Sequence, residues 1–207
     1  VGEGDTGLNT GGMGAYSPSR LENDLLDKKI LDKIIKPTLK ALENLNTFFK
    51  GFLYAGLMIV EGEPYLIEYN VRMGDPECQT ILPRLETNFF EIIEAVINQK
   101  LNQMNLKWCD SKSLSIVQCS NGYPGTYEIN NEIKNLDKIV LTKNEFIFHA
   151  GTKIKDSKIV SNGGRVLNLV AKSNSFKKSR EAVLILIKKI NWENGFYRKD
   201  IGFKVID

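Results

Sequence analysis

The chain has 207 residues and a formal net charge of +3, and 42% of its residues are hydrophobic and 26% charged. This composition is typical of a globular protein and excludes a disordered, collagen-like or coiled-coil chain. At roughly 100–200 residues per domain, we expect one large domain or two small ones. The longest unbroken apolar run, Ala182 to Ile187, is far shorter than the roughly 20 residues that cross a bilayer, so we expect no membrane partner.

The small net charge conceals an uneven distribution. Residues 1–100 carry ten Lys or Arg against fifteen Asp or Glu, whereas residues 101–207 carry eighteen against ten. An acidic half suits a metal ion, and a basic half suits phosphate or nucleic acid. Lysines on solvated faces would give the same balance, so the charge leaves both interpretations open.

The cysteines indicate a reducing compartment. They are widely spaced and form no Cys-x-x-Cys pair: Cys78, Cys109 and Cys119. An odd, scattered set is typical of reduced thiols rather than of a disulfide framework or a zinc site, and we expect a cytoplasmic protein.

In chain order, the glycine- and serine-rich segment 1–18 predicts a loop. Apolar residues at spacings of three and four predict a helix from Leu21 to Ile34, which Pro37 kinks or divides. The strongest local pattern follows, because residues 51–60 and 64–72 predict two strands joined by a tight turn into a hairpin.

The rest of the chain predicts further helices and short strands. Helices are expected over 80–85 and 88–100, and a polar stretch over 101–112 indicates a domain boundary. Four strands are expected beyond it: 114–119, 138–141, 146–150 and 166–171. Ser175 is predicted to cap a helix that reaches about Ile190, and residues 197–206 close the chain. We therefore predict an α+β protein with one domain over 1–104 and a small, β-rich domain over 105–207.

The second strand of the hairpin carries the first candidate site. Glu68, Asn70 and Arg72 share one face, because alternate residues of a strand point the same way. The opposite face is expected to be apolar and buried: Tyr65, Ile67, Tyr69 and Val71. Oxygen ligands suit Mg²⁺ or Mn²⁺, and a guanidinium suits a phosphate. A solvated polar face explains the three residues about equally well.

The segment after this strand and a loop near the start of the chain are further candidates. Residues 72–77 add the carboxylates of Asp75 and Glu77 at a strand end, where functional loops are frequent. Residues Gly11, Gly12, Met13 and Gly14 form a glycine-dense loop whose amides can approach an anion. This loop matches neither a dinucleotide-binding nor a Walker motif, and alone it reads as a flexible loop.

Two turns of the basic half each present one cation, Lys153 and Arg165, which suit a phosphate but are also ordinary in surface turns. The single histidine, His149, lies in an apolar strand and is expected to belong to the core. No Gly-x-Ser-x-Gly, His-Glu-x-x-His or Cys–His arrangement is present, so covalent catalysis and zinc hydrolysis lack support.

Several segments taken together resemble one family, the glycinamide ribonucleotide synthetases (phosphoribosylamine–glycine ligases) of the ATP-grasp superfamily. The resemblance extends in order from Gly4 to Ile206 and is carried by the runs GDTGLNTGGMGAYSP, GFLYAGLM, IEYNVRMGDPECQ, NGYPGTY, FHAGTK, NGGRVL and FYRKDIG. It implies the second lobe of an ATP-grasp domain, an antiparallel sheet with helices, followed by a small mixed α/β carboxy-terminal domain.

The resemblance implies an ADP-forming ligase of purine synthesis that activates glycine with ATP as glycyl phosphate and transfers it to the amine of 5-phosphoribosylamine. Such chemistry needs charge neutralisation rather than a protein nucleophile. By motif match, Glu68 and Asn70 would hold Mg²⁺ or Mn²⁺, Arg72 would face the ATP phosphates, and Asp75 would orient the reacting groups. Loop 11–14 would line the glycine and acyl-phosphate site. Analogy with related enzymes assigns the ribonucleotide phosphate to Lys153 and Arg165.

The family also carries an amino-terminal domain and the first half of the ATP-grasp fold, which hold adenine and have no counterpart here. The resemblance therefore implies the carboxy-terminal half of a monomeric enzyme, inactive without its amino-terminal half. Two alternatives remain: another ATP-grasp carboxylate–amine ligase or biotin-carboxylase-like enzyme, and a non-catalytic anion- or RNA-binding module. The GDPE continuation and NTGGMGAYSP favour the synthetase, and scattered Lys and Arg argue against nucleic acid as a partner.

Overall fold

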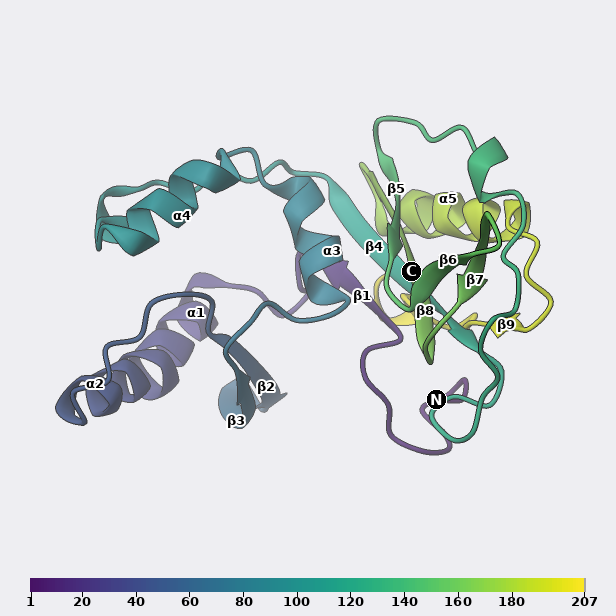
Figure 1. Cartoon of the computed structure of the whole chain (residues 1–207). Helices are drawn as coiled ribbons and strands as arrows, with labels where there is room; N and C mark the ends of the chain where they lie inside the picture. The colour runs from purple at the N-terminus through teal and green to yellow at the C-terminus, as the bar shows by residue number, and fades with distance from the viewer. Residues whose placement is uncertain (207) are drawn as a thin grey trace. The chain divides into compact units, whose positions relative to one another are not determined.

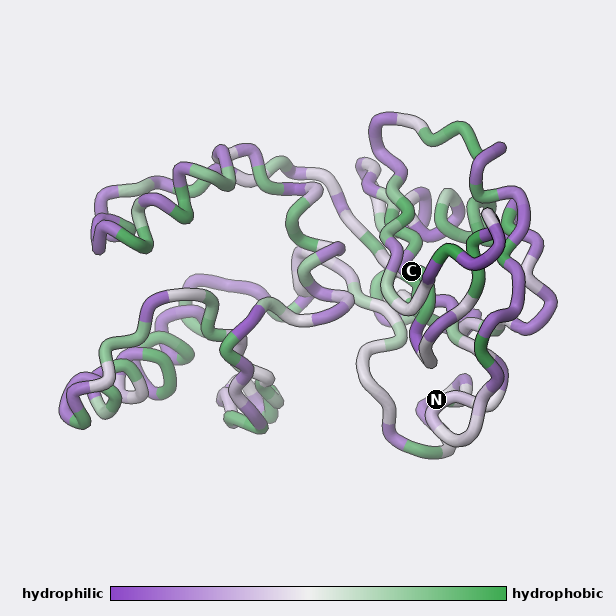
Figure 2. Tube along the Cα trace, viewed as in Figure 1, coloured by the Kyte–Doolittle hydropathy of each residue, from purple (hydrophilic) through white to green (hydrophobic). Residues whose placement is uncertain are grey.

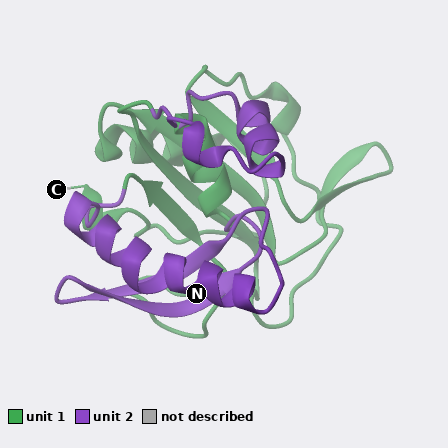
Figure 3. Cartoon of the chain, turned by 90° about the vertical axis from the view of Figure 1, so that its left-hand side faces the viewer, with its two compact units in different colours: residues 1–18, 75–84, 109–207 green, residues 19–74, 85–108 purple. Residues whose placement is uncertain are grey.

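The computed structural model describes residues Val1 to Ile206 and divides the chain into two compact units (Figure 3). Unit 1 comprises residues 1–18 and 75–84 and the chain from 109 onward, and unit 2 comprises residues 19–74 and 85–108. The predicted boundary between residues 104 and 105 divides the chain into consecutive domains rather than into these interleaved units, and it stays a prediction.

Unit 1 is built around an antiparallel sheet in the order β1-β4-β8-β5, with β9 paired to β4 and β6–β7 forming a separate hairpin (Figure 1). Its strands are β1 (Gly14–Ser17), β4 (Lys112–Ser120), β5 (Glu145–His149), β6 (Thr152–Lys155), β7 (Lys158–Ser161), β8 (Arg165–Ser173) and β9 (Gly195–Phe196). Its helices are α3 (Glu77–Ile81) and α5 (Phe176–Lys189), with 3-10 turns at Leu82–Arg84, Leu136–Lys138 and Phe203–Val205.

The core of unit 1 lies between the sheet and α5. Alternate side chains of β4 and β8 pack against the apolar stripe of the helix. The strands contribute Leu114, Ile116, Leu167 and Leu169, the helix contributes Val183 and Leu186, and all six have exposures of 0%. Figure 2 shows the hydrophobic residues gathered along these central strands. As predicted, Ser175 caps α5, because its Oγ accepts the amide hydrogen of Lys178 at 3.3 Å.

The opposite face of the same sheet carries α3. Ser115 on β4 accepts a hydrogen bond from the hydroxyl of Thr80 at 2.8 Å, and both residues are fully buried. The register places Ser115 opposite Val170, and Val117 opposite Asn168, so this face is partly polar where the other is apolar. Buried polar side chains need hydrogen-bond partners, so this face holds a network of polar groups of the kind that binding sites use.

An ion-pair cluster ties the first loop of unit 1 to the segment after β9. The Arg198 guanidinium donates to both carboxylate oxygens of Asp200 at 2.9 and 2.6 Å and to Asp5 at 2.9 Å, and the Gly4 amide also donates to Asp200 at 2.9 Å. Hydrogen bonding from Arg198 lowers the pKa of Asp200 to about 2, although burial acts in the opposite direction. Both partners are largely buried, so the pair is screened less than a surface ion pair.

Unit 2 contains a helical segment, the predicted hairpin and one further helix: α1 (Asp24–Ile30), a π-helical turn (Leu31–Ile35), α2 (Lys36–Asn44), β2 (Tyr54–Val60), β3 (Glu63–Asn70), α4 (Phe89–Ile97) and a 3-10 turn (Leu101–Gln103). Pro37 directly follows the π-helical turn in a helix that runs without a break from Asp24 to Asn44, so it does not divide the helix; a proline inside a helix lacks an amide donor, and irregular turns are frequent beside it. The hairpin lies on the helical segment, because Lys29 and Lys33 both bind Glu63, at 2.5 and 2.6 Å.

Some expectations about elements are wrong. Residues Gly14–Ser17, predicted as loop, form β1, because their backbone pairs with β4. Residues 138–141 form no strand, since the chain turns at Asn135 in the left-handed region and Val140 stays exposed. The hairpin β6–β7 and strand β9 were not predicted, because their strands have only four and two residues.

The prediction of a buried apolar face on the second hairpin strand is also wrong. Tyr65, Ile67 and Val71 are 56%, 66% and 76% exposed. Only Tyr69 of this face is partly buried, because its hydroxyl lies 2.7 Å from the Thr38 hydroxyl on α2. Within unit 2 the helical segment thus covers part of this face only. None of the helices over residues 1–206 is long and apolar enough to cross a membrane.

The Arg198–Asp200 pair predicts a dependence of stability on pH. A carboxyl with a folded pKa of about 2 and an unfolded value of about 3.9 stabilises the fold above about pH 4 and loses that contribution as the pH falls towards 2. Asp200→Asn should lower the free energy of unfolding at pH 7 by about 1–3 kcal/mol. It should also flatten the decline between about pH 4 and pH 2, as measured by urea denaturation.

Asp156→Asn is the matched control, because Asp156 lies exposed at the tip of the β6–β7 hairpin, where asparagine tolerates its positive φ of 49°. Its unfolding curves should follow those of the unsubstituted chain at every pH. Equal stability of the Asp200→Asn variant across this range would contradict the stabilising role of the pair.

Candidate functional site

Glu68 and Asn70 lie on β3 in unit 2, and Arg72 lies two residues past its end, because the strand stops at Asn70 rather than at the predicted residue 72. Asn70 Nδ2 donates to Glu68 Oε1 at 3.1 Å, and Arg72 Nη2 lies 3.4 Å from Asn70 Oδ1. Arg72 Nη1 also donates to the main-chain oxygen of Met73 at 2.9 Å. The end of β3 therefore presents carboxylate and amide oxygens beside the guanidinium of the segment that follows it. The donor set fits a hard divalent cation next to a phosphate.

Asp75 lies in unit 1, where four donors fix its position. Its Oδ1 accepts from Gln79 Nε2 at 3.0 Å and from Asn168 Nδ2 at 3.1 Å, and its Oδ2 lies 3.1 Å from Arg165 Nη2. Its main-chain oxygen accepts from Arg165 Nη1 at 2.6 Å. A carboxylate held at both oxygens from α3 and β8 has one orientation, which suits a group that aligns reactants.

The glycine-rich loop packs against this network without intervening side chains. Arg165 Nη1 also donates to the main-chain oxygen of Gly12 at 3.2 Å. A Cβ on Gly11 would lie 2.9 Å from Arg165 Cζ, and one on Gly12 would collide with the ring of Pro76. The loop needs glycine at these two positions, because its backbone lies directly against the arginine and the start of α3.

The other two residues of this loop are built into the fold of unit 1. Gly14 pairs with Ile116 on β4, and the main-chain oxygen of Met13 accepts the amide hydrogen of Val117 at 3.0 Å. The Met13 side chain is 5% exposed and contacts Cys119. Only the part of the loop around Gly11 and Gly12 is thus open, and the predicted lining role of residues 11–14 stays a prediction.

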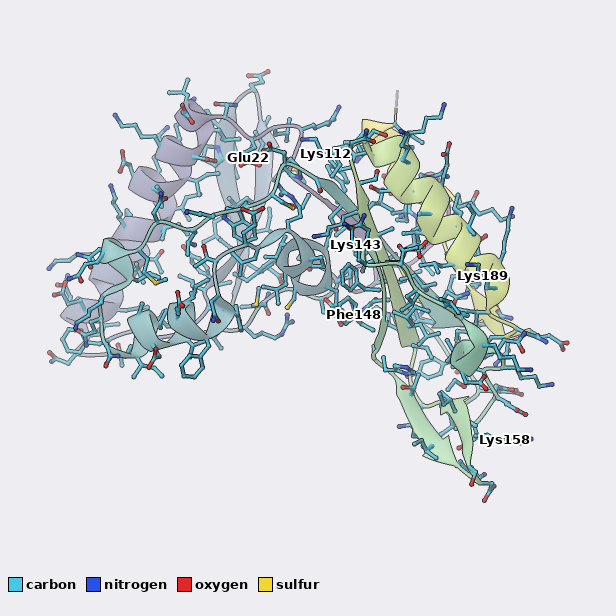
Figure 4. All side chains as sticks on the ribbon, turned by 90° about the horizontal axis from the view of Figure 1, so that it is seen from above. Glu22, Lys112, Lys143, Phe148, Lys158 and Lys189 are labelled. Atoms are coloured by element: carbon cyan, nitrogen blue, oxygen red, sulfur yellow. The ribbon has the colours of Figure 1, made fainter. Side chains whose placement is uncertain are left out.

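The two basic turns lie side by side. The Gly151 amide donates to the main-chain oxygen of Arg165 at 3.0 Å, and the Asn162 amide donates to Gly151 at 2.7 Å. Lys153 itself lies exposed on β6, in the hairpin that carries the labelled Lys158 in Figure 4. Arg165 is three-quarters buried and already bonded to Asp75, so the two predicted phosphate ligands differ in environment.

Two thiols of unit 1, Cys78 and Cys119, are held in their protonated form. Burial raises the pKa of the Cys119 thiol to about 12, although Arg165 acts in the opposite direction. Burial, and secondarily the charge of Asp75, also raise the pKa of Cys78. The expectation that His149 belongs to the core is wrong, since it is exposed and lies 2.9 Å from the Thr152 hydroxyl.

Three residues of the unit 1 network were not singled out from the sequence: Gln79, Asn168 and Tyr123. Asn168 is 1% exposed in the middle of an apolar strand, and a polar residue at such a position is a usable signal. Gln79 follows the predicted acidic loop by one helical turn, and Tyr123 lies within the quoted run NGYPGTY. Among residues 1–206, no three His, Cys, Asp or Glu side chains gather as metal ligands.

Comparison with known families decides where this chain belongs. Residues 1–78 match the ATP-grasp (A) domain of phosphoribosylglycinamide synthetase, and residues 113–204 match the C domain of the same enzyme. The chain belongs to the phosphoribosylglycinamide synthetase family. The family resemblance drawn from the sequence is confirmed, and the unmatched residues 79–112 include the predicted domain boundary.

Curated relatives within this family are similar over nearly the whole chain. The phosphoribosylamine–glycine ligase of Caldanaerobacter subterraneus is 46% identical over 97% of the chain, and the chloroplastic ligase of Arabidopsis thaliana is 42% identical over 100%. The chain spans about half the length of the curated relatives it matches, 47% and 40% in these two cases.

Solved structures confirm the predicted α+β, ATP-grasp fold. A phosphoribosylamine–glycine ligase from Thermotoga maritima is 34% identical, with a TM-score of 0.84 over 97% of this chain and 49% of its own. The biotin carboxylase domain of Hydrogenobacter thermophilus 2-oxoglutarate carboxylase, at 11% identity, reaches a TM-score of 0.62 over 89% of this chain. This second likeness shows a shared fold alone.

The close packing of the glycine-rich loop predicts the effect of a single methyl group. In this synthetase family member, Gly12→Ala would place a carbon against the Pro76 ring and 3.1 Å from the main-chain oxygen of Asp75. The loop or α3 must then shift, at a cost of about 1–3 kcal/mol in the free energy of unfolding. Urea denaturation measures this change.

Gly125→Ala is the control, because Gly125 is exposed and its added carbon would meet a single neighbour, the Gly122 oxygen, at 3.2 Å. Its effect should stay within about 0.5 kcal/mol, as for ordinary surface substitutions. A Gly12→Ala variant as stable as the Gly125→Ala variant would show that the loop does not pack tightly on Pro76.

Proposed function

We propose that the protein containing this chain joins glycine to 5-phosphoribosylamine at the expense of ATP. The γ-phosphate of ATP passes to the glycine carboxylate, giving glycyl phosphate and ADP. The amine then forms the new C–N bond, loses a proton and displaces phosphate, which yields glycinamide ribonucleotide for purine synthesis. The observation that carries this proposal is the row of Glu68, Asn70 and Arg72, which joins oxygen ligands to a guanidinium at the end of β3.

In this proposal Glu68 and Asn70 hold Mg²⁺ or Mn²⁺. Such a cation, when bound, would supply neutralisation of the charge on the transferred phosphoryl group. Arg72 binds phosphate oxygens of ATP through its planar guanidinium, which matches them bidentately. The position of Asn70 supports this role, because its side-chain amide donates to the Glu68 carboxylate and accepts from the Arg72 guanidinium.

Residues of unit 1 would position the second step. Asp75, fixed by Gln79, Asn168 and Arg165, orients the reacting groups. The side-chain-free backbone of Gly11 and Gly12 lies directly against Arg165 and Pro76, and the exposed Gly11 would line the site for glycine and its acyl phosphate. Lys153 and Arg165 would hold the ribonucleotide phosphate. Such a site works by placement and charge, in agreement with protonated thiols at Cys78 and Cys119.

We further propose that this chain is inactive alone. The relatives are about twice as long, and the part of them outside this chain would supply the adenine site as an amino-terminal half. The exposed apolar side chains of β3, including Tyr65 and Ile67, give that half a surface to cover. The assembled protein would be a cytoplasmic monomer that acts on small molecules, with neither nucleic acid nor membrane as a partner.

Reconstitution tests the function. The chain mixed with the amino-terminal half of a relative should release phosphate only when ATP, glycine and 5-phosphoribosylamine are all present. Glu68→Ala should reduce that release at least about 100-fold, because the phosphoryl group loses its charge neutralisation. It should also abolish binding of Mn²⁺ by the chain alone, as followed by electron paramagnetic resonance.

Glu22→Ala is the matched control, since Glu22 is an exposed carboxylate of the same unit (labelled in Figure 4). It should leave phosphate release and Mn²⁺ binding unchanged. Full activity of a folded Glu68→Ala variant would make the metal assignment wrong. Salt-sensitive binding of RNA without any ligase activity in the reconstituted protein would instead favour the non-catalytic alternative.

A further inference from the structure

The run NGYPGTY has no role in the proposed function, yet it lies against the site in unit 1. The Tyr123 amide donates to the main-chain oxygen of Ser120 at 3.1 Å, which turns the chain immediately after β4. The Tyr123 ring packs on the small buried cluster of Met13, Val117 and Cys119. These contacts fix the ring in place, so its hydroxyl has a defined position.

The ring also packs against the turn that carries Arg165. A Cβ on Gly164 would collide with the Tyr123 ring, so the tyrosine lies directly on the glycine backbone. Ser120 fastens this contact, because its amide donates to the oxygen of Gly164 and its hydroxyl donates to the oxygen of Gly163, both at 2.8 Å. Tyr123 and Arg165 are therefore held side by side, although 42 residues of chain separate them.

The Tyr123 hydroxyl reaches the glycine-rich loop. The Gly11 amide donates to it at 3.3 Å, and Gly11 itself lies against the Arg165 guanidinium. A phenol oxygen that accepts this bond still has its own proton to donate. The exposed Gly11 and the partly exposed Tyr123 and Arg165 thus place a neutral donor and a fixed positive charge together at the surface of unit 1.

We propose that Tyr123 is a further binding residue of this site and that its hydroxyl donates a hydrogen bond to a phosphate group held beside Arg165. The inference deepens the proposed function and rests on it. A phosphate suits the pair because it accepts several hydrogen bonds and carries the opposite charge to the guanidinium. Two substrates supply such a group: the sugar phosphate of 5-phosphoribosylamine and the acyl phosphate formed on glycine.

Tyr123→Phe tests the hydroxyl alone, because phenylalanine keeps the ring on Gly164 and on the Met13 cluster. Tyr127→Phe is the matched control, since it removes the hydroxyl of the neighbouring ring, whose centroid lies 6.3 Å from that of Tyr123. Both variants should unfold at the same temperature as the unsubstituted chain, within about 2 °C. A difference in binding between them then reports the Tyr123 hydroxyl rather than the fold.

Direct binding uses the chain as it is. Ribose 5-phosphate titrated into the ¹⁵N-labelled chain should shift the Gly11 amide signal saturably, whereas ribose should not. Tyr123→Phe should weaken this binding about tenfold, as expected for one hydrogen bond to a charged group, and Tyr127→Phe should not. Equal affinities for the unsubstituted chain and Tyr123→Phe, or no saturable shift with the unsubstituted chain, would overturn the inference.

Kinetics of the reconstituted ligase then separate the two phosphates. A rise of about tenfold in the KM for 5-phosphoribosylamine, with kcat and the KM for glycine unchanged, assigns the hydroxyl to the sugar phosphate. A fall in kcat with both KM values unchanged assigns it to the acyl phosphate. An inactive reconstituted ligase whose chain still binds ribose 5-phosphate through Tyr123 would refute the proposed reaction and leave the phosphate site standing.

Discussion

The guanidinium of Arg165 is the contact on which the site in unit 1 depends. It binds the main-chain oxygens of Asp75 and Gly12 and the Asp75 carboxylate, and so joins β8, the start of α3 and the loop before β1. These segments are far apart in the sequence. Removal of the guanidinium would take the donor from Asp75 Oδ2 and from the Asp75 and Gly12 carbonyl oxygens, which is costly in a partly buried place.

One sequence motif supplies groups to both units. The run IEYNVRMGDPECQ carries Glu68, Asn70 and Arg72 in unit 2, and it continues past Gly74 into unit 1 with Asp75 and Gln79. The first part begins as a strand, whose alternation sets Glu68 and Asn70 on one face, and Arg72 follows just past the strand end. The second part begins a helix, whose first turn brings Gln79 back to Asp75. A short stretch of chain thus places polar side chains in unit 2 through a strand and in unit 1 through the first turn of a helix.

Local periodicity explains which parts of this fold could be read from the sequence. The β2–β3 hairpin and the shared face of Glu68 and Asn70 follow from alternation and a tight turn, so they are predicted correctly. The pairing of Arg165 with Asp75 joins residues 90 positions apart, and no local pattern encodes it. The hydrophobic run around Val140 resembles a strand but finds no partner to pair with among the described strands.

The site therefore divides into a predictable and an unpredictable part. Residue types and motifs single out candidate groups such as Asp75, but only the folded chain shows that Asn168 and Gln79 hold its carboxylate. Likewise, the pattern of β3 predicts a polar and an apolar face but not which apolar residues are covered. Whether a side chain is buried depends on the elements that pack on the strand, and the alternation of residues along the strand does not specify them.

The β2–β3 hairpin has a consequence for how this chain behaves in solution. Its outer strand edges have no partner among the described strands, and beside them Ile67 and Val71 stay exposed. Open edges flanked by large apolar side chains are templates for intermolecular β-pairing. Self-association of the isolated chain through this hairpin would accordingly rise with its concentration. It would also compete with any partner protein that pairs with the same strand edge.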